Sequence, residues 1–156
     1  MCSSDLPVWR EIHGYLVHRF LHWKPLYRNV HYLHHKNVNV GPWTGLAMHP
    51  GEHVLYLSAA LIFWLFPSHP LMAVFTLLQG ALSPAIGHTG FENLVLKGKA
   101  KLATGDYYHY LHHRYFECNY GVPLVPFDKW FGTFHDGSPE AHRKMQEKWR
   151  KNRVAA

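Results

Sequence analysis

Histidine is the residue whose number and spacing indicate chemistry in this sequence. The chain of 156 residues contains 15 histidines, and His-Tyr-Leu-His-His occurs twice, at residues 31–35 and 109–113. Positions i, i+3 and i+4 of a helix lie on one face, so each repeat places three imidazoles together, and His18 and His22 add an i,i+4 pair. Eight imidazoles are too many for one tetrahedral site. The spacing therefore predicts a centre that holds two metal ions, because imidazole is a ligand for Fe, Zn, Cu and Ni.

Three short helices are needed to bring these histidines together. The spacing of apolar and histidine residues predicts a first helix over residues 8–24, a second over residues 27–37 and a third over residues 105–115. Strand-like alternation is weak throughout, and Gly and Pro mark the connecting segments as loops. Residues 97–101 are expected to form a basic loop. The sequence therefore predicts an all-α fold.

Two apolar runs, residues 54–66 and 71–86, are joined by Pro-Ser-His-Pro at residues 67–70. No Lys or Arg lies between residues 37 and 96, whereas basic residues flank the pair on both outer sides. This distribution follows the positive-inside rule for a membrane hairpin at about residues 53–87, with both histidine repeats on the cytoplasmic side. Each run is shorter than the roughly 20 residues of a perpendicular span, so a buried soluble hairpin is the alternative.

The net charge of +6 is distributed in a way that argues against a nucleic-acid partner. All the Lys and Arg residues lie on the two sides of the apolar hairpin, and residues 140–153 alone hold six of them against two Glu. This basic tail is expected to be a solvated helix or to contact anionic lipid headgroups. The two cysteines, Cys2 and Cys118, form no paired motif, so no disulfide framework is expected.

The chain divides into three segments. Residues 1–6 have neither the basic region nor the apolar stretch of a signal peptide, and Cys-Ser-Ser-Asp-Leu is what the end of a common sequencing adapter encodes. We therefore expect residues 1–6 to be a non-native leader. Residues 7–139 are expected to form the main domain, and residues 140–156 the basic tail.

Several short motifs accompany the histidine boxes of the main domain. They are HxxxH at residues 18–22, HxxHH at 31–35 and 109–113, HPGE at 49–52, GHTGF at 87–91, NYG at 119–121 and FDKWFGT at 127–133. Taken together, these motifs resemble those of the fatty acid hydroxylase and sterol desaturase superfamily, which are integral-membrane, non-haem di-iron enzymes. The resemblance implies a four-helix membrane anchor beneath a cytosolic helical cap that carries the boxes. Only one hairpin is present, so the chain is expected to lack upstream membrane helices.

The resemblance also implies the metal ligands, with His88 as a ninth. The implied ligands are His18, His22, His31, His34, His35, His88, His109, His112 and His113. Side chains near the boxes are expected to orient ligand imidazoles through their second ring nitrogen or to serve only in capping and surface charge. These are His49, Glu52, Glu92, Asp106 and Asp128, with His53 beside them. The other histidines, His13, His69, His135 and His142, are expected to be ordinary polar residues.

The activity implied for residues 7–139 is the oxygen-dependent hydroxylation or desaturation of a lipid, either a sterol or a fatty-acyl chain. The implied cofactors are two iron ions, which zinc can replace in purified protein, and O2 is the co-substrate. The sequence has neither GxGxxG nor CxxCH, so electrons are expected from an external donor of the cytochrome b5 or ferredoxin type. Expected partners are thus a lipid substrate, the membrane and this donor, but no nucleic acid.

Three other functions are compatible with parts of the sequence. A metal-handling membrane protein would use similar histidines, but it would place polar or ionisable ligands inside its membrane spans. A zinc hydrolase would need fewer protein ligands and the Glu of an HExxH motif, which this chain lacks. An inactive fragment is the third alternative, and the intact boxes argue against it.

Overall fold

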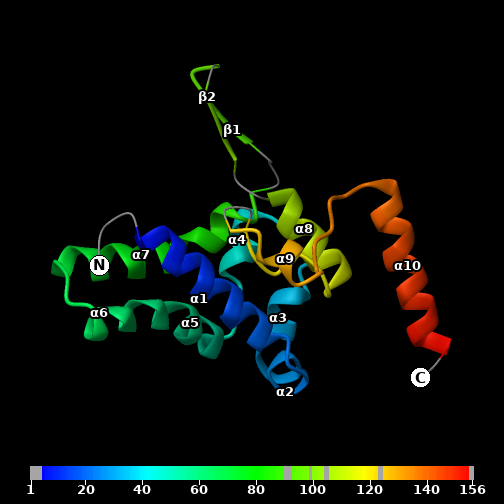
Figure 1. The fold of residues 1–156 in the computed structure, drawn as a ribbon, viewed down its shortest axis with the longest axis horizontal. Coiled ribbons are helices and arrows are strands. Elements are labelled where there is room, and N and C mark those ends of the chain that lie inside the picture. Colours follow the sequence, from blue (N-terminus) through cyan, green and yellow to red (C-terminus); the bar gives the residue numbers. More distant parts are fainter. Residues whose placement is uncertain (1–4, 90–92, 99, 104–105, 123–124, 155–156) are drawn as a thin grey trace.

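The structure, a computed structural model, describes residues 5–89, 93–98, 100–103, 106–122 and 125–154. Helices make up most of this part of the chain (Figure 1), which confirms the prediction of a mainly helical protein. More of the buried side chains are polar or charged than apolar, and most of the histidines of the boxes are among them. The interior is therefore organised around histidine rather than around a large apolar core.

The first two boxes lie on consecutive helical segments, except that His22 stands in the turn after the first helix. Helix α1 (Asp5–Leu21) carries His18, and the chain continues through α2 (Lys24–Leu26), the π-helical turn η1 (Tyr27–His31) and α3 (Tyr32–His35). Pro25 in the first turn of α2 supplies the fixed φ that suits a helix start. The π turn is one residue wider than an α turn and ends at the first histidine of the repeat, and such turns often occur at functional sites.

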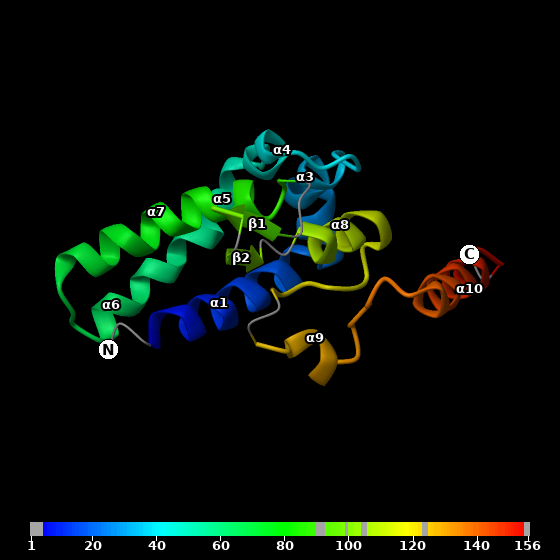
Figure 2. The same cartoon turned by 90° about the horizontal axis from the view of Figure 1, so that it is seen from above.

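Two helical legs, joined by a turn, occupy the segment of the two apolar runs (Figure 2). After α4 (Pro42–Leu46), the first leg consists of α5 (Pro50–Leu57), the 3-10 turn η2 (Ser58–Leu61) and α6 (Ile62–Leu65). The second leg is the single helix α7 (Pro70–Ile86). Both α5 and α7 begin with Pro and are capped by a histidine whose Nδ1 accepts a backbone N–H.

Membrane-spanning helices, which the sequence predicts for the hairpin, are not supported by the structure. Within the described ranges, no helix combines the length and the apolar character that a membrane crossing needs. The physical reason is visible in the first leg, which the 3-10 turn Ser58–Leu61 divides into shorter helices. The second leg, α7, has 17 residues.

Helix α1 lies along the hairpin and satisfies several of its polar groups (Figures 1 and 2). The Trp9 indole N–H donates to the carbonyl oxygen of Ala59 at 2.9 Å, and the Arg10 guanidinium donates to Gln79 Oε1 at 2.5 Å. His13 Nε2 lies 3.0 Å from Ser58 Oγ. Polar groups of the apolar hairpin, from its backbone and its side chains, thus attach it to α1.

A β-hairpin occupies the segment that is predicted from the sequence to be a basic loop. Strand β1 (Asn93–Leu96) pairs antiparallel with β2 (Ala100–Ala103), with Leu96 opposite Ala100. Lys97 and Gly98 in the turn have φ values of 50° and 68°. The hairpin projects away from the helices (Figure 1), so no core contact imposes a clear alternating pattern on its sequence.

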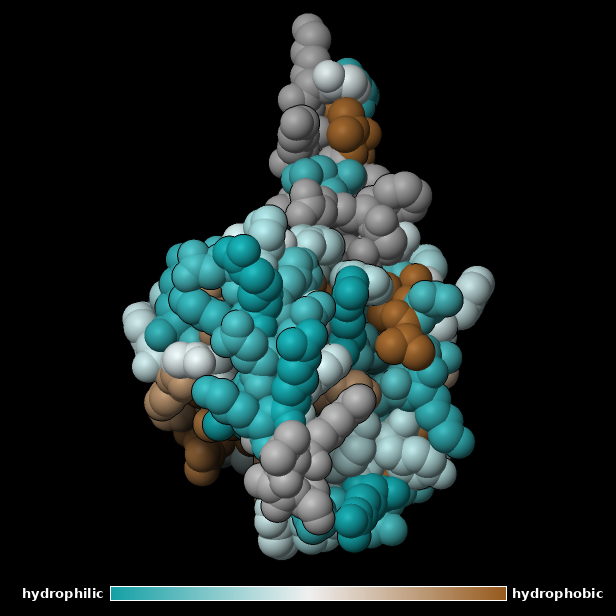
Figure 3. All heavy atoms as spheres, turned by 90° about the vertical axis from the view of Figure 1, so that its right-hand side faces the viewer, coloured by the Kyte–Doolittle hydropathy of each residue, from teal (hydrophilic) through white to brown (hydrophobic). Residues whose placement is uncertain are grey.

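The third box lies on α8 (Asp106–Tyr115), which is followed by α9 (Phe127–Trp130) and α10 (Pro139–Val154). Helix α10 contains the basic tail, and it packs through Met145 and Trp149 against a small cluster of Leu111, Tyr115 and Cys118. Helix α10 lies at the end of the molecule opposite the turn that joins α6 to α7 (Figure 1). The surface at that end is mostly hydrophilic (Figure 3). Helix α10 is therefore a charged helix at the hydrophilic end of the molecule, and its contact with anionic lipid headgroups stays a prediction.

Candidate metal centre

The nine histidines implied as ligands gather in two buried or partly buried groups. In each group, one possible ligand atom from every ring lies within 4.8 Å of the corresponding atoms of the others. We call them the five-histidine cluster and the four-histidine cluster. The five-histidine cluster consists of His18, His22, His31, His35 and His112. The four-histidine cluster consists of His34, His88, His109 and His113.

Each His-Tyr-Leu-His-His repeat contributes to both clusters. In the first repeat the i,i+4 pair His31 and His35 belongs to the five-histidine cluster, while His34 belongs to the other. In the second repeat the assignment is reversed, because the i,i+4 pair belongs to the four-histidine cluster and His112 to the five-histidine cluster. Side chains four residues apart lie above one another on a helix, so each pair converges on one point. The remaining histidine of each repeat, His34 or His112, belongs to the other cluster, so each repeat contributes ligands to both.

The geometry of the five-histidine cluster fits a shared metal ion. The Nε2 atoms of His22, His31, His35 and His112 lie 3.0–3.2 Å apart in five pairs. Nitrogens bound at about 2.1 Å from one ion and at right angles lie about 3.0 Å apart. The Nε2 atom of His18 is buried and has no hydrogen-bond partner among the described residues. A cation is the one species that would satisfy all five nitrogens at once.

The four-histidine cluster has the same character around a different centre. The Nε2 atom of His113 lies 3.1 Å from the Nε2 atoms of His34, His88 and His109. His34, His88 and His113 are buried, and His109 is partly buried. Because α3 and α8 contribute to both clusters, the two centres are neighbours held by the same helices.

Glu52 orients one ring of the five-histidine cluster. Its side chain is fully buried, and Oε1 lies 2.9 Å from Nδ1 of His31. Burial raises the pKa of the Glu52 carboxyl to about 8. A bound cation would favour the ionised carboxylate and thereby strengthen its hydrogen bond to His31.

Three backbone carbonyl groups orient other rings. The Nδ1 atoms of His18 and His112 lie 2.6 Å from the carbonyl oxygens of Tyr120 and Cys118, respectively. The Nδ1 atom of His88 lies 2.7 Å from the carbonyl oxygen of Pro84. A carbonyl oxygen can only accept, so Nδ1 carries the proton in each ring, and in the neutral ring Nε2 keeps its lone pair. These carbonyls therefore select the tautomer that can bind a metal through Nε2.

Burial keeps the clustered imidazoles neutral. Desolvation lowers the pKa of His18 to about 4 and that of His113 to about 3. It also lowers the pKa values of His31 and His112, and neighbouring imidazoles act in the same direction. Metal binding requires neutral imidazole, so no proton has to be removed from these rings near neutral pH.

The other residues expected near the boxes have different positions. His49 is in neither cluster and caps α5, where its Nδ1 accepts the N–H of Gly51 at 3.0 Å. Glu92 and the side chain of Asp106 lie outside the described part of the chain. Asp128 is buried, and it accepts hydrogen bonds from backbone amides and hydroxyl groups rather than from imidazoles in the part of the chain that the structure describes. Sequence reasoning missed the carbonyl contacts, because every residue has a carbonyl and no residue type signals them.

Gly45 allows α4 to approach the four-histidine cluster. A Cβ atom at this position would collide with the carbonyl group of Pro84 and lie 2.8 Å from Nδ1 of His88. These are the two atoms of the hydrogen bond that orients His88. Only glycine fits between α4 and the end of α7 without moving that hydrogen bond.

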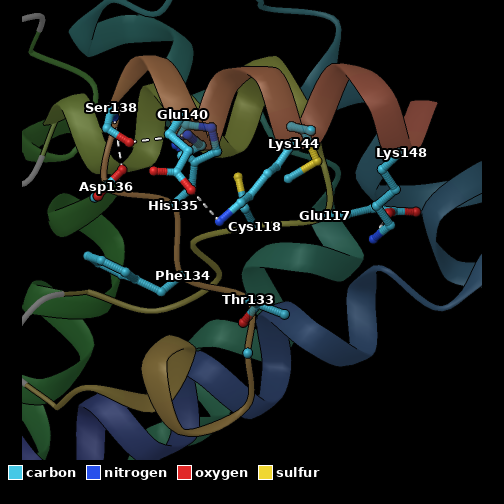
Figure 4. A pocket seen from close by; sticks show the side chains of 13 residues that line it. Glu117, Cys118, Thr133, Phe134, His135, Asp136, Ser138, Glu140, Lys144 and Lys148 are labelled. Atoms are coloured by element: carbon cyan, nitrogen blue, oxygen red, sulfur yellow. Dashed lines mark hydrogen bonds and ion pairs between the residues drawn. The ribbon is translucent and has the colours of Figure 1, made fainter. Parts of the chain in front are cut away.

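A cavity of about 400 Å³ lies apart from the two clusters. It is situated between α10 and residues 132–136, and charged side chains, including the Lys144–Glu140 ion pair, line much of it (Figure 4). None of the nine clustered histidines lines it. Its polar lining does not suit a lipid tail.

Comparisons with known proteins agree with the arrangement of these motifs. The chain is 28% identical over 148 residues to a Delta(7)-sterol 5(6)-desaturase of Gibberella zeae, covering 90% of the chain and 46% of the relative. It is 33% identical over 136 residues to the Delta(7)-sterol-C5(6)-desaturase of Nicotiana tabacum, covering 84% of the chain and 48% of the relative. The corresponding enzyme of Schizosaccharomyces pombe is 32% identical over 139 residues, which cover 86% of the chain and 44% of the relative.

The chain thus spans about half the length of these curated relatives. No solved structure matches it. The sequence model of the fatty acid hydroxylase family matches residues 6–133, a range that contains both histidine clusters. The chain therefore belongs to the fatty acid hydroxylase family.

Proposed function

We propose that this protein is an oxygen-dependent di-iron oxidoreductase that desaturates or hydroxylates a lipid, with a sterol as its substrate. The observation that supports this most strongly is the convergence of nine histidines on two neighbouring points. The sterol desaturases among its relatives support the choice of lipid class. A single catalytic zinc needs about three protein ligands, so the clusters do not suit a zinc hydrolase.

The residues of the clusters suit the binding of iron. Two iron ions bound there would activate O2 for the cleavage of an unactivated C–H bond, which no side chain can accomplish. The carbonyl groups of Tyr120, Cys118 and Pro84 hold three rings with Nε2 directed to the ion. Glu52, whose carboxyl group contacts His31, would supply a negative charge to the five-histidine cluster once a cation is bound.

The exposed apolar side of the hairpin supports a lipid environment. Large apolar side chains that are more than half exposed occur on both legs, and a patch of this kind usually marks a contact with a membrane or a partner. We propose that this side of the hairpin contacts the bilayer interior, with both clusters at its cytoplasmic side. The side chains are Val54, Leu61, Trp64, Leu65, Phe66, Leu71, Phe75, Leu78, Leu82 and Ile86.

The proposal extends to the chain's organisation and its electron supply. Residues 7–139 form the catalytic unit. Within this unit, the two legs of the hairpin end beside the clusters, near Glu52 and His88. A substrate held against the hairpin therefore reaches the clusters from the lipid side. Reducing equivalents come from an external carrier of the cytochrome b5 or ferredoxin type.

Product analysis tests this function. The detergent-purified protein would be loaded with Fe(II) and incubated with a Delta(7)-sterol, O2 and a reduced donor, and the sterols would be analysed by mass spectrometry. We expect a sterol that has lost a pair of hydrogens or gained one oxygen, and no product from His112→Ala. Two bound irons with no oxidised sterol product would contradict the proposed function and favour a metal-handling role.

A further inference from the structure

The loop between α8 and α9 holds two of the carbonyl groups that orient the five-histidine cluster. We call residues 118–121 the anchoring loop. Its Cys118 carbonyl oxygen lies 2.6 Å from Nδ1 of His112, and its Tyr120 carbonyl oxygen lies 2.6 Å from Nδ1 of His18. A displacement of this loop would therefore turn two rings of one cluster.

Asn119 fixes the conformation of the anchoring loop. It is fully buried and has a φ of 52°, a conformation that asparagine tolerates better than most residues. Its Nδ2 donates to the carbonyl oxygens of Tyr108 and His135 at 3.1 and 3.0 Å, and its Oδ1 accepts the N–H of His135 at 2.8 Å. The side chain thus links the loop to α8 and to the segment before α10.

Asp128 holds the other end of the loop. Its Oδ1 accepts the Tyr120 N–H at 3.0 Å and the Thr133 hydroxyl at 2.5 Å. Its Oδ2 accepts the Gly121 N–H at 2.8 Å and the Tyr108 hydroxyl at 2.7 Å. Asp128 is 2% exposed, and no Lys or Arg in the described ranges forms an ion pair with it. Four donors on one buried carboxylate fix its position.

We infer that Asp128 is a positioning residue for the five-histidine cluster, acting through the anchoring loop rather than by contact with a metal or substrate. The carboxylate fixes the Tyr120 and Gly121 amides, and the carbonyl groups of the same loop fix His18 and His112. This inference rests on the proposed function in one respect, namely that the cluster binds a metal ion.

Loss of the Asp128 carboxylate is expected to weaken metal binding at the five-histidine cluster only. In the four-histidine cluster, the carbonyl that orients His88 belongs to Pro84 in α7, whereas the carbonyls of Cys118 and Tyr120 in the anchoring loop contact His112 and His18 of the other cluster. Weaker binding at one centre only would therefore separate a positioning role from a general loss of stability.

The test measures metal affinity in two backgrounds. His34→Ala leaves the five-histidine cluster intact, and His112→Ala leaves the four-histidine cluster intact. Asp128→Asn would be added to each, and Co(II) affinity of the full chain in detergent would be measured by chelator competition and by the Co(II) absorption spectrum. We expect about 10-fold or greater weakening and an altered spectrum in the first background only, the size seen for other outer-shell partners.

Milder variants keep the test decisive if Asp128→Asn does not fold. Tyr108→Phe and Thr133→Val each remove one donor to Asp128, and we expect smaller changes in the same background. Asp136→Asn is the control, since this exposed carboxylate accepts the Ser138 N–H in a nearby turn.

Equal weakening in both backgrounds, or unchanged Co(II) affinity in the His34→Ala background, would overturn the inference. Absence of metal binding by the wild-type protein would overturn it together with the proposed function. Metal binding without lipid oxidation would contradict the proposed function alone, because the site-selective effect of Asp128→Asn would still be measured.

Discussion

The two histidine clusters share helices but differ in what holds their rings. The five-histidine cluster takes its rings from α1 and the turn after it, η1, α3 and α8, and it is supported by Glu52 and by two carbonyls of the anchoring loop. In the four-histidine cluster, the carbonyl oxygen of Pro84, which lies next to Gly45, is 2.7 Å from Nδ1 of His88. The supports of the first cluster thus include a buried carboxyl group and a loop distant in sequence, whereas the support of His88 depends on the close packing of α4 against α7.

The comparison shows how one sequence motif can build two different sites. Each repeat gives an i,i+4 pair to one cluster and its remaining histidine to the other, and the two repeats do so in opposite senses. Loss of one histidine should therefore remove one metal ion, and under the proposed function the loss of either ion should abolish oxidation. Substitutions in either cluster, or in its supports, can test this independence.

Loss of a ligand is expected to have the largest effect. His112→Ala removes a nitrogen from the five-histidine cluster, and His34→Ala removes one from the four-histidine cluster. Each should reduce metal affinity at its own cluster by more than about 100-fold, above the range for outer-shell changes, and abolish activity. Elemental analysis and product assays measure both effects. Loss of both ions from either variant would show that the clusters are not independent.

Removal of the Glu52 carboxylate should have a somewhat smaller effect. Glu52→Ala leaves His31 Nδ1 without the acceptor 2.9 Å away and should weaken metal binding at the five-histidine cluster about 10- to 100-fold. Glu52→Gln keeps an acceptor oxygen and should retain part of the affinity. Glu140→Ala, at an exposed ion pair, is the control. Chelator competition in the His34→Ala background is the measurement, and an equal loss in the His112→Ala background would contradict it.

Gly45→Ala tests the packing that supports the four-histidine cluster. The added Cβ would collide with the Pro84 carbonyl and displace the contact to His88, at an overpacking cost of about 1–3 kcal/mol. We expect metal affinity to fall at the four-histidine cluster and to change little at the other. Thermal unfolding and metal titration in the two ligand-variant backgrounds measure this. Wild-type affinity at the four-histidine cluster would show that the contact can relax.

Gly14→Ala is expected to have the smallest effect, and it should raise the free energy of unfolding rather than lower it. Gly14 lies within α1, and a Cβ atom there would meet no atom within 4 Å. Alanine should stabilise the folded protein by about 0.5–1 kcal/mol, because glycine loses more backbone freedom in a helix. Neither cluster should change its metal affinity. A fall in the free energy of unfolding would indicate that α1 packs more closely at this position than the structure shows.

Local signals in the sequence predict the main helices and the convergence of the boxes, but not their division into two clusters. The i,i+4 pairs and the Pro and Gly residues at helix ends are local signals, and they predict α1, α7 and α8 well. The separation of His34 from His31 and His35 is not a local property, because it depends on how α3 meets α8. The Cys118 and Tyr120 carbonyls depend on the left-handed conformation of Asn119, and a sequence pattern does not reveal which backbone atoms that conformation directs to a ring.

Metal stoichiometry tests the central claim most directly. Elemental analysis of the detergent-purified wild-type protein, His112→Ala and His34→Ala would be made under the same loading conditions. If the two clusters are separate iron sites, the wild-type protein should hold two irons per chain and each variant one. A wild-type protein with one ion or none after loading would contradict the existence of two metal centres.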